Sequence, residues 1–497
     1  MCPRQRSDHP RRRRENRVLG FERQLQVLLF GRVAAEWLSL LGVVIAVLIS
    51  VHVLLHKREV GTSMGWMGLV WLSPFAGGLL YAVFGVNRVG RRARVLRHAS
   101  EAPRRRVAHP GPPARNAHLA PLARATTRIT ERPLLGGNDV EVFHCGDEAY
   151  PAMLRAIAAA RRSVALATYI LRDDLAGGEF IEALIAAHRR GVEVRVLIDG
   201  IGSGYFWSSA YNRLTRARVP VGRFMHSPLP WRMPFLNLRT HKKILLADGR
   251  IGFTGGMNIG RENLLASRPR RGVRDTHFRL RGPVVGQLAE AFAQDWHFVT
   301  DEDLSGTDWF PTPADAGHAN ARIVTSGPDA DVQKIEFILL EAIACAHHSV
   351  RIQTPYFLPD EHLITALSLA ALRGVTVDIV LPTKSNHFIM DWALRANVGP
   401  LLRHGCRIWL NPPPFDHSKL AVVDNEWCLI GSANWDTRSF RLNFEINVEL
   451  SDPDLAVRLA EQIDANKGRP LTMEELDRRS LPVRLRDAAV RLLLPYL

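Results

Sequence analysis

Cysteines are few in this sequence, and their spacing excludes the frameworks that cysteines usually build. The 497 residues include five cysteines, at positions 2, 145, 345, 406 and 428, and none of them forms a C-x-x-C pair. An odd number of scattered cysteines indicates neither a disulfide scaffold nor a zinc site, and it fits a reducing compartment. HExxH, EF-hand and Walker patterns are also missing, so the sequence predicts no motif-borne metal or nucleotide site.

An excess of positive charge is missing from most of the chain, although the whole sequence carries a formal net charge of +16. Residues 1–125 contain 21 Lys and Arg against 6 Asp and Glu, which leaves 44 basic and 43 acidic residues for the remainder. Proteins that bind nucleic acid by counterion release need basic groups along the binding surface. The near-neutral remainder therefore disfavours a nucleic-acid partner.

The overall composition is that of a folded protein with more than one domain. Hydrophobic residues make up 46% of the chain and charged residues 23%, which argues against long-range disorder. A single hydrophobic core rarely extends over 497 residues, so we expect a membrane segment and two domain-sized units.

Two apolar stretches near the N-terminus predict a transmembrane hairpin within residues 33–87. Residues 37–55 run without a formal charge for roughly 28 Å at ~1.5 Å per residue, and residues 66–86 form a second such stretch, interrupted by Pro74. Spanning helices tolerate an interior proline. The alternatives are two buried core helices or a cleaved signal peptide, but no small-residue cleavage site follows the first stretch.

Arginines flank the predicted hairpin on both outer sides. They lie in the basic segment 1–32 and at the start of a Pro/Arg/Ala-rich linker, 88–125, and include Arg11, Arg12, Arg13, Arg14, Arg17, Arg88, Arg91, Arg92, Arg94 and Arg97. The short loop between the two stretches carries little net charge. By the positive-inside rule we expect a multi-pass protein in the cell membrane, with both flanks and everything after residue 87 facing the cytoplasm.

An internal duplication organises the rest of the chain. The segment HKKILLADGRIGFTGGMN begins at position 241 and HSKLAVVDNEWCLIGSAN begins at position 417. Five residues, a His, a Lys, an Asp, a Gly and an Asn, are identical in the two segments and recur at the same spacing. Upstream, RRGVEVRVLID and LRGVTVDIVLP repeat an amphipathic run followed by a β-branched strand, which is typical of βαβ units. We therefore predict two α/β domains related by duplication, at 126–315 and 316–497.

The repeated motif carries residues suited to phosphodiester chemistry: His241, Lys243 and Asp248 in the first copy, and His417, Lys419 and Asp424 in the second. In H-x-K both side chains project from the same face of a strand. The two lysines supply charge for a phosphate, one histidine attacks phosphorus, and the other transfers the proton. This set makes a divalent metal unnecessary, and no metal site or cofactor is expected.

Four further residues are candidates for supporting roles. Asn258 and Asn434 follow glycines in both copies, and we expect them to reach the phosphate. Asp275 and Glu445 lie at matching distances before Leu280 and Leu450. We hypothesise that these two carboxylates hydrogen-bond and orient the histidines; the alternative is a surface role.

With these residues the chain resembles the phospholipase D superfamily, whose H-x-K-x4-D motif it carries twice. More closely it is similar to the bacterial cardiolipin synthases, on segments such as YILRDD, RDTHFRLRGP, TSGPD and TPYFLPD. The resemblance implies an enzyme of the bacterial inner membrane. It implies transfer of phosphatidyl from one phosphatidylglycerol to another, giving cardiolipin and glycerol through a phosphohistidine, without metal or cofactor. Phosphatidylglycerol and anionic membrane lipid are the partners implied.

Other functions remain open at this point. A superfamily member could use water, serine or phosphatidylethanolamine as acceptor, and the motifs alone do not discriminate. A phosphodiesterase-type nuclease should present a basic groove, which the near-neutral charge after residue 125 disfavours. A catalytically inert lipid-binding relative would usually lack one of the four His and Lys residues, and all four are present.

Three finer expectations complete the sequence-based prediction. His241 is expected to be the nucleophile and His417 the acid/base, because Asp416 beside His417 should favour its protonated form. The apolar segment 228–236 is expected to form a lip that dips into the membrane interface. The C-terminal segment 483–497, with arginines and leucines, is expected to make a second such contact.

Overall fold

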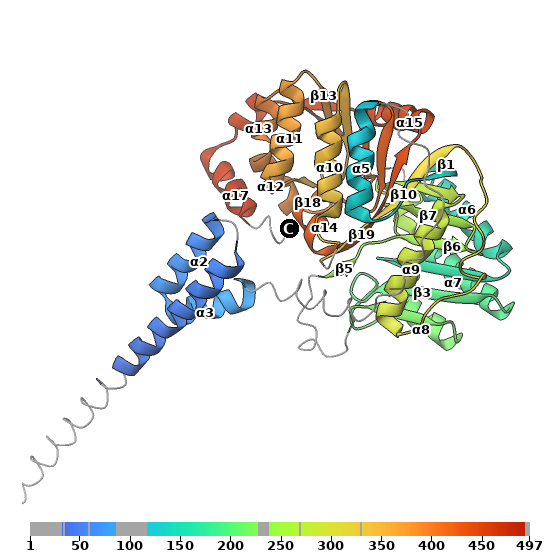
Figure 1. Cartoon of the computed structure of the whole chain (residues 1–497), viewed down its shortest axis with the longest axis horizontal. Coiled ribbons are helices and arrows are strands. Elements are labelled where there is room, and N and C mark those ends of the chain that lie inside the picture. Colours follow the sequence, from blue (N-terminus) through green and yellow to red (C-terminus); the bar gives the residue numbers. More distant parts are fainter. Residues whose placement is uncertain are drawn as a thin grey trace, which may run out of the picture. The chain divides into compact units, whose positions relative to one another are not determined.

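The structure is a computed structural model that describes residues 32, 35–57, 60–85, 117–226, 238–267, 270–328 and 331–492 (Figure 1). The chain divides into two compact units, residues 1–88 and 89–497. The segment 228–236 and most of the linker 88–125 lie outside the described residues.

Among the described residues of the first unit, one helix is long and apolar enough to cross a membrane, Ala35–His56, with a mean hydropathy of 2.7 in its most apolar part. It is followed by α2 (Val60–Leu72), α3 (Pro74–Leu80) and a short π-helix, η1 (Tyr81–Gly85). The Trp71 indole nitrogen donates to the Ser50 hydroxyl at 3.1 Å, and His52 Nδ1 lies 2.7 Å from the Tyr81 hydroxyl. The second apolar stretch therefore packs along the first.

The second apolar stretch is not the continuous helix that the sequence predicts for 66–86. The chain reverses between α2 and α3, so that the rings of Trp66 and Tyr81 lie 5.2 Å apart. The break falls at Ser73, whose backbone is extended, and Pro74 begins the next helix. Pro74 has no backbone N–H and cannot continue the hydrogen-bond ladder of α2, which is the physical reason for the difference.

The second unit is built on one sheet that runs through both copies of the duplication. The first-half elements are β1 (Leu135–His144), α6 (Cys145–Ala159), β2 (Ser163–Thr168), α7 (Leu175–Arg189), β3 (Glu193–Asp199), α8 (Ser209–Arg216), β4 (Val221–Phe224), β5 (Arg239–Thr240), β6 (Ile244–Ala247), β7 (Ile251–Gly255), η4 (Arg261–Asn263), β8 (Val273–Arg274), β9 (Thr276–Arg281) and α9 (Val284–Thr300).

The second half repeats this order with added elements within it and at its end. Its elements are β10 (Ala319–Ser326), α10 (Lys334–Cys345), β11 (Ser349–Gln353), β12 (Phe357–Leu358), α11 (Glu361–Leu372), β13 (Thr376–Pro382), α12 (Phe388–Asn397), α13 (Gly399–Arg403), β14 (Arg407–Asn411), β15 (Phe415–Asp416), β16 (Leu420–Val423), β17 (Trp427–Gly431), β18 (Trp435–Asp436), α14 (Thr437–Arg441), β19 (Asn443–Ser451), α15 (Pro453–Ala465), β20 (Arg469–Leu471), α16 (Met473–Asp477) and α17 (Leu481–Arg491).

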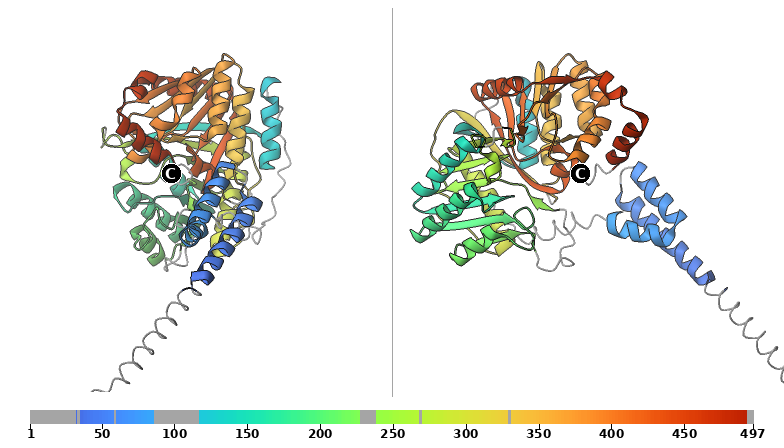
Figure 2. Two further views of the ribbon diagram at one scale, coloured as in Figure 1. Left: turned by 90° about the vertical axis from the view of Figure 1, so that its left-hand side faces the viewer. Right: turned by 180° about the vertical axis from the view of Figure 1, so that it is seen from behind.

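The strand order shows the duplication directly. The main sheet runs β20-β14-β13-β11-β16-β17-β19-β10-β1-β9-β7-β6-β2-β3-β4, with β5 paired to β19. Outward from the central antiparallel pair of β1 and β10, each half presents its strands in the same sequence. Figure 2 shows the two halves side by side, the first in green and the second in orange to red. The predicted α/β class with two repeated halves is confirmed.

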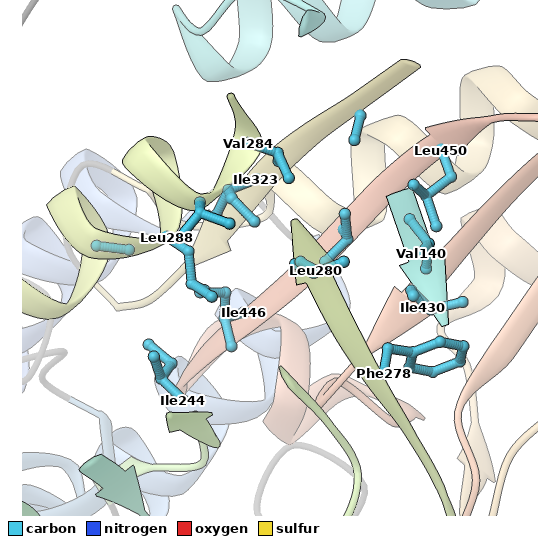
Figure 3. Close-up of a cluster of buried hydrophobic side chains, with 14 of the residues drawn as sticks. Val140, Ile244, Phe278, Leu280, Val284, Leu288, Ile323, Ile430, Ile446 and Leu450 are labelled. Atoms are coloured by element: carbon cyan, nitrogen blue, oxygen red, sulfur yellow. The ribbon is translucent and has the colours of Figure 1, made fainter. Parts of the chain in front are cut away.

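A shared hydrophobic core joins the two halves at the centre of the sheet. Val140 and Leu280 from the first half lie in one cluster with Ile323 and Ile446 from the second, and all four are buried (Figure 3). These strands are rich in β-branched and aliphatic residues because both of their faces are covered. Each such side chain stabilises the fold by roughly 1.5–3 kcal/mol through burial. The halves therefore do not have separate cores at this junction.

Part of the segment predicted as a linker is folded. The 3-10 helix η2 (Ala117–Leu119) leads into α5 (Ala120–Thr130), which begins inside the stretch 88–125 and lies beside α10 (Figure 1). Leu119 and Leu122 are buried in the second-half core. The sequence did not reveal this helix because its apolar positions are few and a proline, Pro121, usually indicates a break. Here Pro121 stands at the start of the helix, where proline is well tolerated.

The C-terminal helix α17 packs against α12. The Arg486 guanidinium lies 4.1 Å from the centroid of the Trp392 ring, and both Arg479 and Arg486 pair with the buried Asp487. Leu485 on this helix is exposed. Residues 493–497, the end of the predicted second membrane contact, lie outside the described residues.

Candidate active site

The two H-x-K motifs lie at the carboxyl edge of the parallel strands in each half. Ile244, which follows the first motif, is opposite Ala167 near the end of β2, and Leu420, which follows the second, is opposite Gln353 at the end of β11. The carboxyl edge of parallel strands is where open α/β sheets usually place their ligands. Both motifs are therefore brought to the same kind of position by the same local topology.

Each motif is held by the backbone of the other half. The amide of His241 donates to the Phe444 carbonyl at 2.8 Å, and the amide of His417 donates to the Arg274 carbonyl at 2.7 Å. The two imidazole rings consequently face each other across the junction, with centroids 6.5 Å apart and planes at 82°. That separation leaves room for a group between the two rings.

The predicted carboxylates contact the histidines in a crossed pattern. His241 Nδ1 lies 3.1 Å from the Glu445 carboxylate, and His417 Nδ1 lies 2.8 Å from the Asp275 carboxylate. Each histidine thus pairs with an acid from the opposite half. With Nδ1 occupied by a carboxylate, Nε2 of each ring is the atom left to face a substrate.

Glu445 is itself held by two further neighbours besides His241. Ser432 Oγ donates to it at 2.5 Å, the Asn443 amide donates at 3.1 Å, and the side chain is fully buried. Burial raises its pKa, but the charge of His241, the hydrogen bond to that ring and Lys243 outweigh burial and hold the pKa below its usual value. Glu445 is therefore the ionised partner of His241.

Asp275 has the opposite tendency. Burial raises its pKa to about 6, although the charge of Lys419 opposes the shift. Burial also lowers the pKa of both histidines, and for His417 the charge of Lys419 pushes it well below its ordinary value. Both rings therefore release a proton more readily than a free imidazole does, a tendency that suits a nucleophile and a proton acceptor.

The two lysines are buried next to the histidines. Lys243 Nζ donates to the carbonyl of His241 at 2.6 Å, and Lys419 Nζ lies 3.0 Å from His417 Nδ1. Burial lowers the pKa of Lys243 to about 7 and that of Lys419 to about 8. The charge of Lys419 also lowers the pKa of Lys243, and the charges of both lysines lower the pKa of His417. An arriving phosphate would reverse these shifts, because it favours the charged ammonium.

Both motif asparagines have an unsatisfied atom. Asn258 Oδ1 and Asn434 Oδ1 are buried without a hydrogen-bond partner among the described residues. The glycines before them, Gly255 and Gly431, have φ of 151° and 153°, and a Cβ at Gly431 would lie 2.3 Å from Asn447 Oδ1. Only glycine fits this bend, which lets the asparagines turn toward the site.

Two tyrosines belong to the site, although sequence analysis gave them no role. Tyr169 packs edge-on against His241 at 5.3 Å, and Tyr356 packs edge-on against His417 at 6.3 Å. Lys243 Nζ lies 5.7 Å from the Tyr169 ring. The signal was present in the echoed segments VALATYILRDD and VRIQTPYFLPD, each of which ends a strand with an aromatic residue.

The structure does not bring Asp248 and Asp424 to the histidines. Asp248 accepts backbone N–H bonds from residues 161, 162 and 163 at 2.7–3.1 Å, where β2 begins. Asp424 does the same for residues 347, 348 and 349 before β11, and it also contacts His118 at 3.0 Å. Both aspartates lie at the amino edge of the sheet, one strand length from the H-x-K residues.

Asp416 does not contact His417 through its carboxylate. Its Oδ1 accepts from the Ser418 amide at 3.0 Å, and its Oδ2 lies 3.8 Å from the Arg274 guanidinium. The shift in the His417 pKa has other causes, with burial first and Lys419 next. The expectation that Asp416 favours protonated His417 is therefore wrong, because the adjacent side chain points to backbone and arginine instead.

A cavity of about 1060 Å³ opens on the His417 side of the site. It is lined by residues of both halves, including Asn258 and Trp207 from the first and Asn386 and Phe415 from the second. The site therefore has a polar chamber next to His417 large enough for a glycerol headgroup.

The chain matches one protein-family model and several named proteins. The model is described as "Cardiolipin synthase, PLD-like domain" and matches residues 153–296 and 339–466. The cardiolipin synthase of Geobacillus kaustophilus is 32% identical over 461 residues, covering 91% of this chain and 92% of that protein. The major cardiolipin synthase ClsA of Bacillus subtilis is 32% identical over 480 residues, covering 93% and 98%.

A further relative and a solved structure extend the comparison. Cardiolipin synthase A of a Pseudomonas aeruginosa strain is 33% identical over 453 residues, covering 89% of this chain and 92% of that protein. The crystal structure of the Haemophilus influenzae phosphatidylserine synthase superposes with a TM-score of 0.58 at 15% identity, covering 76% of this chain and all of that one. At this identity the superposition shows the fold alone.

Proposed function

The chain belongs to the cardiolipin synthases with phospholipase D-like domains and is a phosphatidyltransferase; we propose that it transfers phosphatidyl from one phosphatidylglycerol to another. The products are cardiolipin and glycerol. The observation that carries the proposal is the crossed constellation of two histidines, each with a buried carboxylate on Nδ1 and a lysine beside it.

The first half-reaction forms a covalent intermediate. His241 Nε2 attacks phosphorus of the donor lipid, and the bond from phosphorus to the headgroup glycerol oxygen breaks. Lys243 and Lys419 stabilise the negative charge that builds on the phosphoryl oxygens, with Asn258 and Asn434 as additional donors. The bound phosphodiester anion favours the charged form of His417, in which Nε2 also carries a proton, and that proton passes to the departing glycerol oxygen and leaves the ring neutral. The chain's own residues thus supply each role that the chemistry requires.

The second half-reaction runs the same steps in reverse with a new alcohol. The headgroup hydroxyl of a second phosphatidylglycerol gives its proton to His417 and attacks phosphorus of the phosphohistidine. The bond from phosphorus to His241 breaks, and the ring returns to its neutral form. Glu445 accepts the Nδ1 hydrogen of His241 throughout, and Asp275 does the same for His417.

The assignment of His241 as nucleophile now rests on the carboxylates. A phosphorylated imidazole with a proton on Nδ1 is cationic, so it is best stabilised by an acid that stays ionised. The pKa of Glu445 is held low, whereas that of Asp275 is raised to about 6. The chamber beside His417 also offers the glycerol headgroup a place on the acid/base side.

Asp248 and Asp424 are assigned a positioning role in this proposal. Each fixes the loop that enters the first parallel strand of its half, and so holds the strand whose far end carries the tyrosine of the site. The proposed halves are 126–315 and 316–497, with a basic N-terminal segment 1–32 and hairpin 33–87 before them.

Membrane attachment rests on the apolar helix Ala35–His56 and on the lipid-synthesising relatives. We place the chain in the bacterial cell membrane with residues after 87 in the cytoplasm, because arginines follow the apolar segment immediately. A multi-pass arrangement requires α2 and α3 to straighten into one span in the bilayer.

The purified full chain, incubated with phosphatidylglycerol vesicles with and without phosphatidylethanolamine, tests the reaction by mass analysis of the lipids. Cardiolipin and glycerol in equal amounts are expected. Phosphatidic acid alone would identify water as the acceptor, and a mixed product would identify phosphatidylethanolamine. After a quench in detergent at neutral to alkaline pH, where the phosphorus–nitrogen bond survives, His417→Ala protein should carry lipid phosphorus on His241. Label on His417 in the His241→Ala protein would reverse the roles.

A further inference from the structure

Two large aromatic side chains stand exposed on a loop beside the active site. Phe206 is 84% exposed and Trp207 is 74% exposed, on the segment that joins β3 to α8. Aromatic residues gain more from burial than almost any other side chain, so exposure of two in succession indicates a surface that is covered in use.

The second half presents apolar side chains at the matching place. Phe388 is 61% exposed and Ile389 is partly exposed, at the start of α12 after β13. Gly191 precedes β3, and its counterpart Gly374 precedes β13. With the same difference in residue number, Phe388 and Ile389 are the counterparts of Tyr205 and Phe206. The duplication has therefore kept an apolar tip after the same parallel strand in both halves.

Both tips adjoin residues that line the chamber beside His417. Trp207 from the first tip and Asn386 beside the second line the same cavity as His417. Tyr356, which packs against His417, also contacts Asn386 through its hydroxyl and His387 through its ring. The apolar tips and the proton-transferring histidine thus share one opening.

The first tip is fixed rigidly to the catalytic motif. Asp199 accepts backbone N–H bonds from Ile201 and Gly202 at the base of the loop, and from Thr240, the neighbour of His241, at 3.0 Å. The Arg223 guanidinium donates to three carbonyls of the same loop. Because this loop is held in place, it cannot rearrange to bury its two exposed aromatic rings within the protein itself.

We propose that Phe206 and Trp207, together with Phe388 and Ile389, form a paired rim that inserts into the headgroup region of an anionic phospholipid bilayer. The inference rests on the proposed function, since both substrates of that reaction are bilayer lipids. Indole and phenyl rings favour the membrane interface, and an inserted rim lets a lipid headgroup pass into the chamber without entering bulk water. The rim would align the two histidines with the plane in which the phosphates lie.

Fluorescence quenching by lipid tests the contact directly on the full chain. An environment-sensitive fluorophore is attached at Phe206→Cys, at Phe388→Cys or at Leu372→Cys, and the chain is reconstituted into phosphatidylglycerol/phosphatidylcholine vesicles. Leu372 is 64% exposed, much like Phe388, but it ends α11 before β13 begins and so lies at the opposite edge of the sheet. Labelled wild type gives the background from native cysteines.

A lipid-borne nitroxide near the headgroup should quench the fluorophore at 206 and 388 at least threefold more than at 372. Equal quenching at all three positions would overturn the proposal. In a second measurement, the Phe206→Ser/Phe388→Ser protein should lose about tenfold in rate on vesicles but stay within twofold of wild type on monomeric short-chain phosphatidylglycerol. Leu372→Ser should match wild type on both.

The two proposals fail in different ways. If wild type makes no cardiolipin from either substrate, the proposed function fails, while the quenching result still decides whether the rim meets lipid. If wild type is active and the rim variants behave like Leu372→Ser in both measurements, only the rim is refuted.

Discussion

His417 Nδ1 lies 2.8 Å from the Asp275 carboxylate, although the two residues belong to opposite copies of the duplication. The same crossing joins His241 to Glu445. A carboxylate on Nδ1 fixes the tautomer and orientation of an imidazole and stabilises its charged form. Each half therefore supplies one reactive ring and the support for the other ring.

This crossed pairing predicts different kinetic defects for two conservative substitutions. Asp275→Asn should impair proton transfer by His417, and Glu445→Gln should impair formation of the phosphohistidine on His241. We expect each to lower kcat by about 10²–10⁴-fold, by analogy with loss of the orienting carboxylate in hydrolytic triads. Rapid quench with radiolabelled lipid should show accumulated covalent intermediate in Asp275→Asn and almost none in Glu445→Gln.

Asn443→Ala provides a matched control, because Asn443 donates to Glu445 without contacting a histidine. It should lower activity far less than Glu445→Gln. If Asp275→Asn abolished labelling while Glu445→Gln accumulated it, the roles of the two histidines would be exchanged; equal effects of the two substitutions on labelling would refute the assignment.

The motif aspartates should affect stability more than chemistry. Asp248→Ala removes an acceptor for three backbone N–H groups, which should cost roughly 1–3 kcal/mol of folding free energy. The midpoint of thermal inactivation should fall by several degrees, while kcat at low temperature stays within about threefold of wild type. A hundredfold loss of kcat with unchanged thermal inactivation would instead indicate a direct catalytic role.

The lysine pKa values predict that lipid affinity falls as pH rises. An ammonium is charged below its pKa, so attraction for the phosphodiester is present at pH 6 and is lost through about pH 7 for Lys243 and about pH 8 for Lys419. KM for phosphatidylglycerol should rise by about tenfold or more between pH 6 and 9, with kcat changing less, because bound phosphate restores the charge.

Steady-state kinetics across this range provide the measurement. Lys243→Arg keeps its charge at every pH, so its KM should depend less on pH even if kcat is low. A wild-type KM that stays constant from pH 6 to 9 would show that neither lysine loses its proton in this range.

Labelling in intact cells should establish how the apolar segment sits in the membrane. A cysteine at Val60, which is exposed at the start of α2, is compared with a cysteine at Ser100. We expect a membrane-impermeant reagent to reach position 60 from outside and to miss position 100. Labelling at position 100 and not at 60 would place the catalytic unit outside the cytoplasm, and a tag at the N-terminus then distinguishes one crossing from two.

Much of the site was predictable because the duplication repeats the reactive residues at a constant spacing within a single sequence. A shared offset selects His241 and His417 from nineteen histidines, and the same offset selects the lysines. Matching distances before Leu280 and Leu450 also picked out Asp275 and Glu445. Spacing could not reveal that the carboxylates cross over, since that depends on the pairing of β5 with β19 and of β15 with β8.

Other features depend on three-dimensional context that spacing does not encode. Asp248 follows Lys243 by five residues, but β6 runs between them, so the aspartate reaches the other edge of the sheet. Asp416 is adjacent to His417, yet successive side chains on a strand point to opposite faces. The reversal at Ser73 was also missed, because a proline in an apolar run is compatible with either a kinked span or a turn.

The exchange of carboxylates between copies has a consequence for genetic robustness. Duplication ordinarily supplies a second copy of a function, so that the intact copy compensates for a damaging mutation in the other. Here a single lesion in either copy disables both: loss of Glu445 reaches the first copy's histidine, and loss of Asp275 reaches the second's. The two copies are therefore mutually dependent, and a chain that retained only one copy would need a second chain to supply the carboxylate for its histidine.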